Sequence, residues 1–145
     1  MKNQFLILFL FIGIIGNAQN WKSAFEEAKE QALNENKNIL LVFSGSDWCA
    51  PCIKLDKTIW QSDAFKTVAN EKWVIYKADF PKKKENTLPV ELATTNKNLA
   101  EIYNKSGNFP LVILLNNLGS ILGMSGYKNV SPTEYIKIIQ SFEIK

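Results

Sequence analysis

Two cysteines three positions apart, Cys49 and Cys52, carry the most evident chemistry in this sequence. The 145 residues contain no other cysteine and no histidine. A pair with this spacing can exchange with other disulfides, bind a metal ion or form a structural crosslink. Since the chain has no histidine, another group must carry the protons of any exchange reaction.

The sequence gives less support to the metal site and to the crosslink. A structural zinc site needs about four ligands, which two cysteines without histidine do not supply in one chain. A crosslink between Cys49 and Cys52 closes a very short loop, which restricts the unfolded chain only slightly. We therefore favour a working dithiol and expect no bound metal.

The residues around the pair indicate how such a dithiol would work. An apolar run ends at Ser44–Gly45, and a helix is predicted to start near Ala50. Cys49 then lies at a helix N-terminus, where free N–H groups and the helix dipole favour a thiolate. Cys52 follows one turn later on the same face. Cys49 can therefore attack a substrate disulfide, and Cys52 can resolve the mixed disulfide.

The first 18 residues have the organisation of a secretory signal peptide. Lys2 precedes an apolar run from Phe5 to Ile15, and a small-residue cleavage site ends at Ala18. An uncleaved membrane anchor is the alternative, although the run is shorter than the ~20 residues that span a bilayer. We expect a signal peptide over 1–18 and a mature domain over 19–145. Export to the periplasm or another extracytoplasmic space would let a disulfide persist.

The overall composition is that of a single globular domain, with 46% hydrophobic and 21% charged residues. The net charge is only +3 and every basic residue is lysine. Nucleic acid is therefore not an expected partner, because base and phosphate recognition favours arginine. We interpret the run Lys82–Lys84 as a solvated loop face.

Helices and strands are expected to alternate along the mature chain. Helical spacing of apolar residues predicts helices over 21–37, 50–68, 99–107 and 131–142, with a restart of the second at Ser62–Asp63. Apolar runs predict strands over 38–45 and 72–80, and a hairpin over 109–127 that turns at 116–119. Residues 81–98 are interpreted as a loop with one helical turn, either a tolerated insertion or a lid.

The stretch Trp48-Cys49-Ala50-Pro51-Cys52 resembles the W-C-x-P-C motif of the thioredoxin family. The order of predicted elements resembles that family over nearly the whole mature chain. The leading helix and the sequence SGSDWC are most similar to the exported thioredoxin-like and thiol-disulfide interchange branch. The resemblance implies an α/β thioredoxin fold, with a central four-stranded mixed sheet flanked by helices and an extra N-terminal helix.

The resemblance also implies a substrate-binding surface beside the dithiol. Pro110 matches the family's cis-proline, which leaves the preceding backbone free to pair with an extended substrate; a trans proline opening an edge strand is the alternative. Phe109 stands where the family often has a smaller residue, and Trp48 would form an apolar wall. Ala50 and Pro51, between the cysteines, tune the reduction potential and are close to the Gly-Pro of reducing thioredoxins.

The proton acceptor of this chain departs from the family. Many members carry a buried acid six positions before the first cysteine, where this sequence has Phe43. Asp56 follows Cys52 by four residues on the same helix face, so it is our candidate to accept the Cys52 proton, directly or through water. A solvated Asp56 is the alternative. Asp47 is a second candidate, which we expect to point into solvent.

Together these features predict an exported thiol-disulfide oxidoreductase that reduces or exchanges protein disulfides. We expect a monomer without a cofactor. The resemblance implies that a membrane thiol-disulfide electron donor recharges it, and delivery of electrons to apocytochrome cysteines stays open. A redox-inactive binding module with the same fold and a dithiol oxidase are the alternatives.

Overall fold

The computed structural model describes residues 21–144, so the predicted signal peptide lies outside the described residues. The described chain alternates helices and strands. In order, the elements are β1 (Trp21–Lys22), α1 (Phe25–Glu35), β2 (Asn38–Ser44), α2 (Ala50–Leu55), the π-helical turn η1 (Asp56–Trp60), α3 (Asp63–Lys72), β3 (Trp73–Asp79), the 3-10 turn η2 (Lys84–Asn86), α4 (Val90–Tyr103), β4 (Leu111–Leu115), β5 (Ile121–Ser125) and α5 (Pro132–Ser141).

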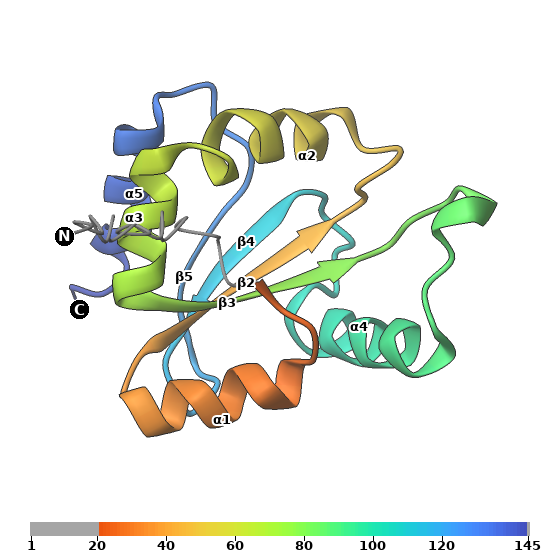
Figure 1. Cartoon of the computed structure of the whole chain (residues 1–145), viewed down its shortest axis with the longest axis horizontal. Coiled ribbons are helices and arrows are strands. Elements are labelled where there is room, and N and C mark those ends of the chain that lie inside the picture. Colours follow the sequence, from red (N-terminus) through yellow and green to blue (C-terminus); the bar gives the residue numbers. More distant parts are fainter. Residues whose placement is uncertain (1–20, 145) are drawn as a thin grey trace, which may run out of the picture.

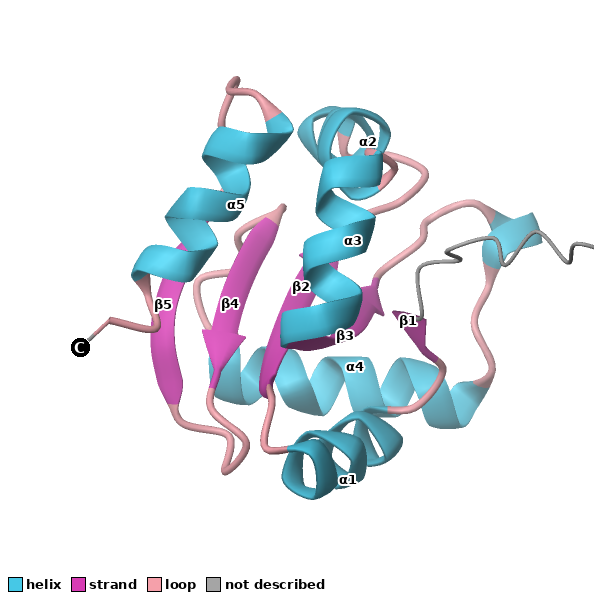
Figure 2. Cartoon of the chain, turned by 60° about the vertical axis from the view of Figure 1, so that its left-hand side comes forward, coloured by secondary structure: helices cyan, strands magenta, loops and turns pink. Residues whose placement is uncertain are grey.

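The strands form one mixed sheet in the order β1-β3-β2-β4-β5 (Figures 1 and 2; all five strands are labelled in Figure 2). β1, β3 and β2 are parallel, and β4 runs antiparallel to both β2 and β5. The four expected strands are confirmed, and the short β1 adds a fifth. Trp21 and Lys22 were expected in the first helix, but they pair with Ile75 and Tyr76 of β3. The helix starts only at Phe25 because the backbone of Ala24 is extended.

Each face of the sheet carries its own apolar core. α2, η1, α3 and α5 cover one face, and α1 and α4 cover the other (Figures 1 and 2). Successive side chains of a strand point to opposite faces. In β2, Leu40 and Val42 accordingly enter the first core, and Leu41 and Phe43 enter the second. The continuous apolar run of β2 is thus explained by burial on both faces.

The segment 81–98 differs from its prediction as a loop. α4 begins at Val90 and continues without a break to Tyr103. The sequence pattern hid this helix because a polar residue, Asn96, occupies a position that faces the core and is 1% exposed. Its side chain accepts a hydrogen bond from the Tyr76 hydroxyl at 2.7 Å and donates one to the Asp79 carbonyl at 3.0 Å. Those partners make the burial of an amide tolerable.

Helix boundaries elsewhere follow the capping residues of the sequence. The Ser62 side chain accepts a hydrogen bond from Phe65 N and starts α3, which confirms the predicted restart. Ser131, Pro132 and Glu134 form the expected capping box at the start of α5. Among the described residues, no helix combines the length and apolar character needed to cross a membrane.

Candidate active site

The two cysteines lie where β2 gives way to α2. Cys49 is the residue that caps α2, and Cys52 lies in its first turn; the two form a disulfide with their Cα atoms 5.2 Å apart. The amide of Cys52 donates a hydrogen bond to Cys49 Sγ at 3.3 Å. This is the kind of contact that favours a thiolate over a thiol. Both residues are buried in the oxidised form, at 4% and 3% exposure.

Trp48 forms a fixed wall beside the first cysteine. Its indole Nε1 donates a hydrogen bond to the Phe80 carbonyl at 2.7 Å, and its ring meets that of Phe109 edge to face at 5.5 Å between centroids. The ring also lies directly on Gly45, where an added Cβ would stand 2.3 Å from it. Gly45 is therefore required by the close approach of the indole.

The Phe109–Pro110 peptide bond is cis. β4 begins immediately after it, and the pairing of Phe43 with Leu111 brings the start of β4 beside the end of β2, from which the cysteine loop departs. Phe109 therefore contacts Trp48, although the two residues are 61 positions apart in the sequence. Both belong to the surface beside the dithiol.

The loop after β5 packs against this proline. A Cβ added to Gly126 would lie 3.5 Å from the Pro110 carbonyl oxygen. The hydroxyl of Tyr135, on α5, donates to the Gly126 carbonyl at 2.8 Å and anchors the loop. Burial raises the pKa of Tyr135 to about 12, with a smaller opposing effect from Ser125, so this phenol remains a neutral donor.

A small pocket of about 120 Å³ lies behind the second cysteine, and it contains our candidate proton acceptor. Its lining residues are Ser44, Ser46, Cys52, Ile53, Asp56, Lys57 and Lys77. The volume exceeds what one water molecule needs. Asp56 also accepts a long hydrogen bond from Gln61 Nε2, at 3.4 Å. The structure therefore places Asp56 and Cys52 on one pocket.

Lys77 is the residue of this pocket that the sequence analysis missed. It lies in β3, pairs with Val42 of β2, and has its ammonium 5.6 Å from the centroid of the Trp21 ring. Its strand alternation could have indicated it, because Trp73 and Ile75 precede it on the same face and enter the core beneath α2. Phe43, in place of the family's acid, is fully buried on the opposite face.

Asp47 does not point into solvent as expected. Its carboxylate accepts hydrogen bonds from Lys82 N at 2.9 Å, Lys83 N at 3.0 Å and Asn86 Nδ2 at 2.9 Å. These bonds, led by that of Asn86, lower the pKa of Asp47. Asp47 thus ties the segment after β3 to the cysteine loop, and it is a poor candidate for the acceptor of the Cys52 proton.

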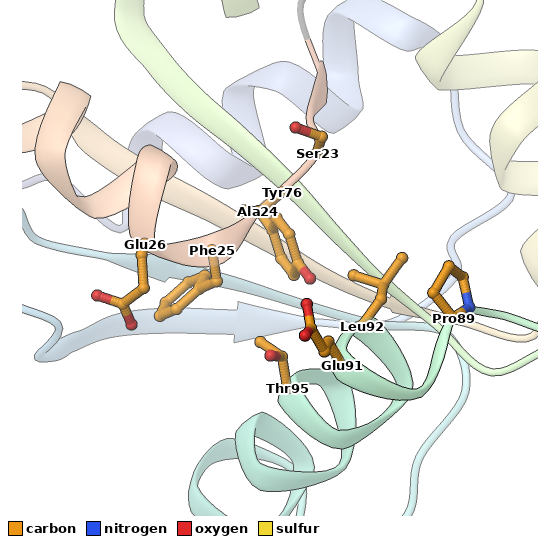
Figure 3. Close-up of a pocket in the computed structure, with 9 residues that line it drawn as sticks. All are labelled: Ser23, Ala24, Phe25, Glu26, Tyr76, Pro89, Glu91, Leu92 and Thr95. Atoms are coloured by element: carbon orange, nitrogen blue, oxygen red, sulfur yellow. The ribbon is translucent and has the colours of Figure 1, made fainter.

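A larger pocket of about 290 Å³ lies on the other face of the sheet, between α1, β3 and α4 (Figure 3). Phe25, Tyr76 and Leu92 supply apolar surface there, and Glu91 lies at its edge. Neither cysteine lines it, so this pocket is separate from the dithiol.

The sheet order, the cis-proline and the linked cysteines together define a protein of the thioredoxin fold with a redox dithiol. Sequence comparison agrees, since the model of a thioredoxin-like family matches residues 20–117. The disulfide bond reductase DsbH of Chlamydia pneumoniae is 34% identical over 121 residues, which cover 83% of this chain and 70% of that protein. The thioredoxin-related protein DsbJ of the same organism is 28% identical over 122 residues, which are 77% of this chain but only 33% of DsbJ.

Solved structures give the same assignment. A structure described as DsbH oxidoreductase matches with a TM-score of 0.79 at 32% identity, covering 85% of this chain and 83% of its own. A thioredoxin from Thermus thermophilus matches with a TM-score of 0.62 at 14% identity, covering 83% and 85%, and shows the fold alone. The chain belongs to the thioredoxin-like family. It is a thiol-disulfide oxidoreductase with one cysteine pair.

Proposed function

We propose that this protein is an exported reductase of protein disulfides that acts through Cys49 and Cys52. The observation that carries the proposal is the linked cysteine pair at the start of α2, next to the surface of Trp48 and Phe109. Reduction is supported over oxidation by Ala50–Pro51 between the cysteines and by the relative that is named a disulfide bond reductase.

In the reduced protein, the Cys49 thiolate attacks one sulfur of a substrate disulfide. A bond forms between Cys49 and the substrate as the substrate's S–S bond breaks, and the first substrate sulfur leaves. Cys52 then loses its proton, attacks Cys49 Sγ and releases the second substrate sulfur. Each departing sulfur takes up a proton. Counted from the neutral dithiol, two electrons and two protons pass to the substrate, and the Cys49–Cys52 disulfide remains.

The surface beside the dithiol would hold the substrate during this reaction. Trp48 and Phe109 offer apolar contact, and the cis peptide at Pro110 leaves the backbone before it free to pair with an extended chain. Asp56 would accept the Cys52 proton directly or through a water in the shared pocket. Ala50 and Pro51 would set the stability of the thiolate, and hence the potential.

Reduction of insulin by the mature chain, with dithiothreitol as electron source, tests the proposal. We expect turnover by the wild type, loss of turnover in Cys49→Ser, and accumulation of a mixed disulfide in Cys52→Ser. Equal, negligible turnover in wild type and Cys49→Ser, with no trapped substrate, would instead indicate a redox-inactive binding module. The equilibrium of the pair with glutathione separates a reductase from an oxidase, because a strong oxidant would be fully reduced at typical cytosolic glutathione ratios.

Export is the second part of the proposal. The basic start, the apolar run and the small-residue site over 1–18 support cleavage after Ala18. An exported reductase needs an electron source outside the cytoplasm, and we propose a membrane thiol-disulfide transporter as the donor. Mass spectrometry of the secreted protein should find Gln19 at the N-terminus; retention of 1–18 would contradict the prediction.

A further inference from the structure

A set of aromatic and apolar side chains lies on the surface beside the dithiol, with a lysine over the aromatic ring at each end. We name it the lysine–aromatic rim, and it consists of Lys82, Trp48, Phe109, Pro110, Tyr127 and Lys54. Its two ends belong to different segments, one after β3 and the other on α2 facing the loop after β5. In Figures 1 and 2, the segment after β3 and the loop after β5 lie on either side of α2.

At the first end, Lys82 is held in two ways. Its ammonium lies 3.9 Å from the centroid of the Trp48 ring, well within the range of a cation–π contact. Its backbone amide is bound by the Asp47 carboxylate at 2.9 Å. The residues Lys82–Lys84 are all exposed, as expected of a solvated loop face, but the first of their charges also lies over the ring of the residue that precedes Cys49.

At the second end, Lys54 lies two positions after Cys52 on α2. Its ammonium is 5.5 Å from the centroid of the Tyr127 ring. Tyr127 follows Gly126, which packs against the Pro110 carbonyl and is anchored by Tyr135. A second cation thus lies over an aromatic ring, between α2 and the loop after β5.

Among the residues that the structure describes, neither Lys54 nor Lys82 forms a salt bridge. Asp47 directs both of its oxygens to the amides of the segment after β3 and to Asn86. Asp56 lines the pocket behind Cys52 and binds Gln61. Between the two lysines the rim is apolar, with Phe109 half-buried and Pro110 buried. The surface therefore has cationic ends and an apolar centre next to Cys49.

We propose that this rim selects disulfide substrates whose cysteine is flanked by acidic side chains on both sides. The inference rests on the proposed reductase function and names the substrate class of the same site. An extended acidic protein segment fits the rim better than a lipid surface does, because the exposed cations accompany an apolar strip only a few residues long, which adjoins the sulfur that a substrate must reach. Opposite charges would raise the rate of encounter more than the affinity of the complex.

Steady-state reduction of three disulfide-linked model peptides tests this inference. The peptides differ only in whether Glu, Gln or Lys flanks the cysteine on both sides. We expect kcat/KM for the Glu peptide to exceed that for the Gln peptide by about fivefold at low ionic strength, with the Lys peptide slowest. In about 1 M salt, where charges are screened within ~3 Å, the preference should shrink below about twofold.

The variant Lys54→Gln/Lys82→Gln should bring the ratio between the Glu and Gln peptides close to one. Lys29→Gln is the matched control, because Lys29 also lies over an aromatic ring, that of Phe25 at 5.9 Å, but on α1 on the other face of the sheet. We expect this control to keep the wild-type ratio. The same lysine-to-glutamine change is then compared at the rim and away from it.

The possible outcomes separate this inference from the proposed function. Equal rates for the three wild-type peptides, or a preference that survives in the double variant, would overturn the rim's role and leave the reductase intact. Failure to reduce any peptide would overturn both. Binding of the wild type but not of the double variant to phosphatidylserine vesicles, without any peptide preference, would assign the lysines to a membrane surface and overturn the inference.

Discussion

Asp56 and Cys52 share a pocket behind the disulfide, and the transfer of one proton between them would decide how fast a mixed disulfide is resolved. The family's usual acid is replaced by Phe43, which is fully buried on the other face of the sheet. The Cys52 proton must therefore pass to a group other than the buried acid of the family. Lys77 lines the same pocket, with its ammonium 5.6 Å from the centroid of the Trp21 ring.

We predict that Asp56→Asn slows resolution of the mixed disulfide at neutral pH by more than a few-fold, because the amide cannot accept the proton. The initial attack by Cys49 should change much less. Stopped-flow measurement with a fluorescent substrate separates the two steps. Asp63→Asn, an exposed carboxylate on α3 that does not line the pocket, is the control. Equal resolution rates in the wild type and Asp56→Asn would remove Asp56 from the mechanism.

At the scale of elements, the helix α5 and the strand β5 cooperate to place the loop beside Pro110. The link is the hydrogen bond from the Tyr135 hydroxyl to the Gly126 carbonyl. Tyr135 is fully buried, and its pKa is raised to about 12 by that burial. The unfolded chain would ionise this tyrosine near its ordinary value of ~10. Its contribution to stability is therefore complete below about pH 10 and is lost as the pH rises toward 12.

Tyr135→Phe tests this dependence. Near pH 8 the variant should be less stable than the wild type by about 1 kcal/mol, because the Gly126 carbonyl loses its donor. Between pH 10 and 12 the wild type should lose ~2 kcal/mol more than the variant does, so that the order of the two stabilities reverses. Urea unfolding across this range measures the difference. A gap that stays constant with pH would contradict the prediction.

The elements that the sequence predicted best have strong local signals. The capping box of Ser131 and Glu134, the restart at Ser62 and the apolar run of β2 were all read correctly, because each depends on neighbouring residues. The sequence analysis missed the first part of α4 because the polar residue Asn96 is buried there. Its burial depends on hydrogen bonds with Tyr76 and Asp79, which are distant in sequence. The sequence analysis assigned Trp21 to a helix for a similar reason, since the strand with which it pairs lies more than 50 residues away in the sequence.

In the candidate site, too, contacts between neighbouring residues could be predicted, and contacts between residues distant in sequence could not. Cys49, Cys52 and Trp48 are adjacent in sequence, so their association could be predicted. The role of Asp47 as an anchor for residues 82–86 could not, because its three donors lie beyond β3. The contact of Lys82 with Trp48 could not be predicted either, because the two residues are distant in sequence.

At the scale of the whole molecule, one sheet separates two cores that have no side chain in common. Trp60 is central to the core beneath α2, where it packs against Phe65 and Tyr135. Phe25 belongs to the core beneath α1, where it meets Tyr76 edge to face. Since the same strands β2, β3 and β4 contribute to both, we expect the two cores to unfold together.

Trp60→Ala and Phe25→Ala should each lower the free energy of unfolding by about 3–5 kcal/mol through loss of buried aromatic surface. In both variants, far-UV circular dichroism and tryptophan fluorescence should report one transition with the same midpoint. Val90→Ala, at a site that is 82% exposed, is the control and should change stability by less than about 0.5 kcal/mol. Two separate transitions in either core variant would show that the sheet does not couple the cores.

The register between β2 and β4 has a practical consequence for engineering. Phe43 of β2 pairs with Leu111 of β4. The cysteine loop follows this end of β2, and the cis-proline directly precedes β4. The dipeptide between the cysteines is solvent-facing, since Ala50 and Pro51 are both exposed. We therefore predict that other dipeptides can replace these two residues without disturbing either core. Such replacements would change the reduction potential of the pair while leaving the scaffold unaltered.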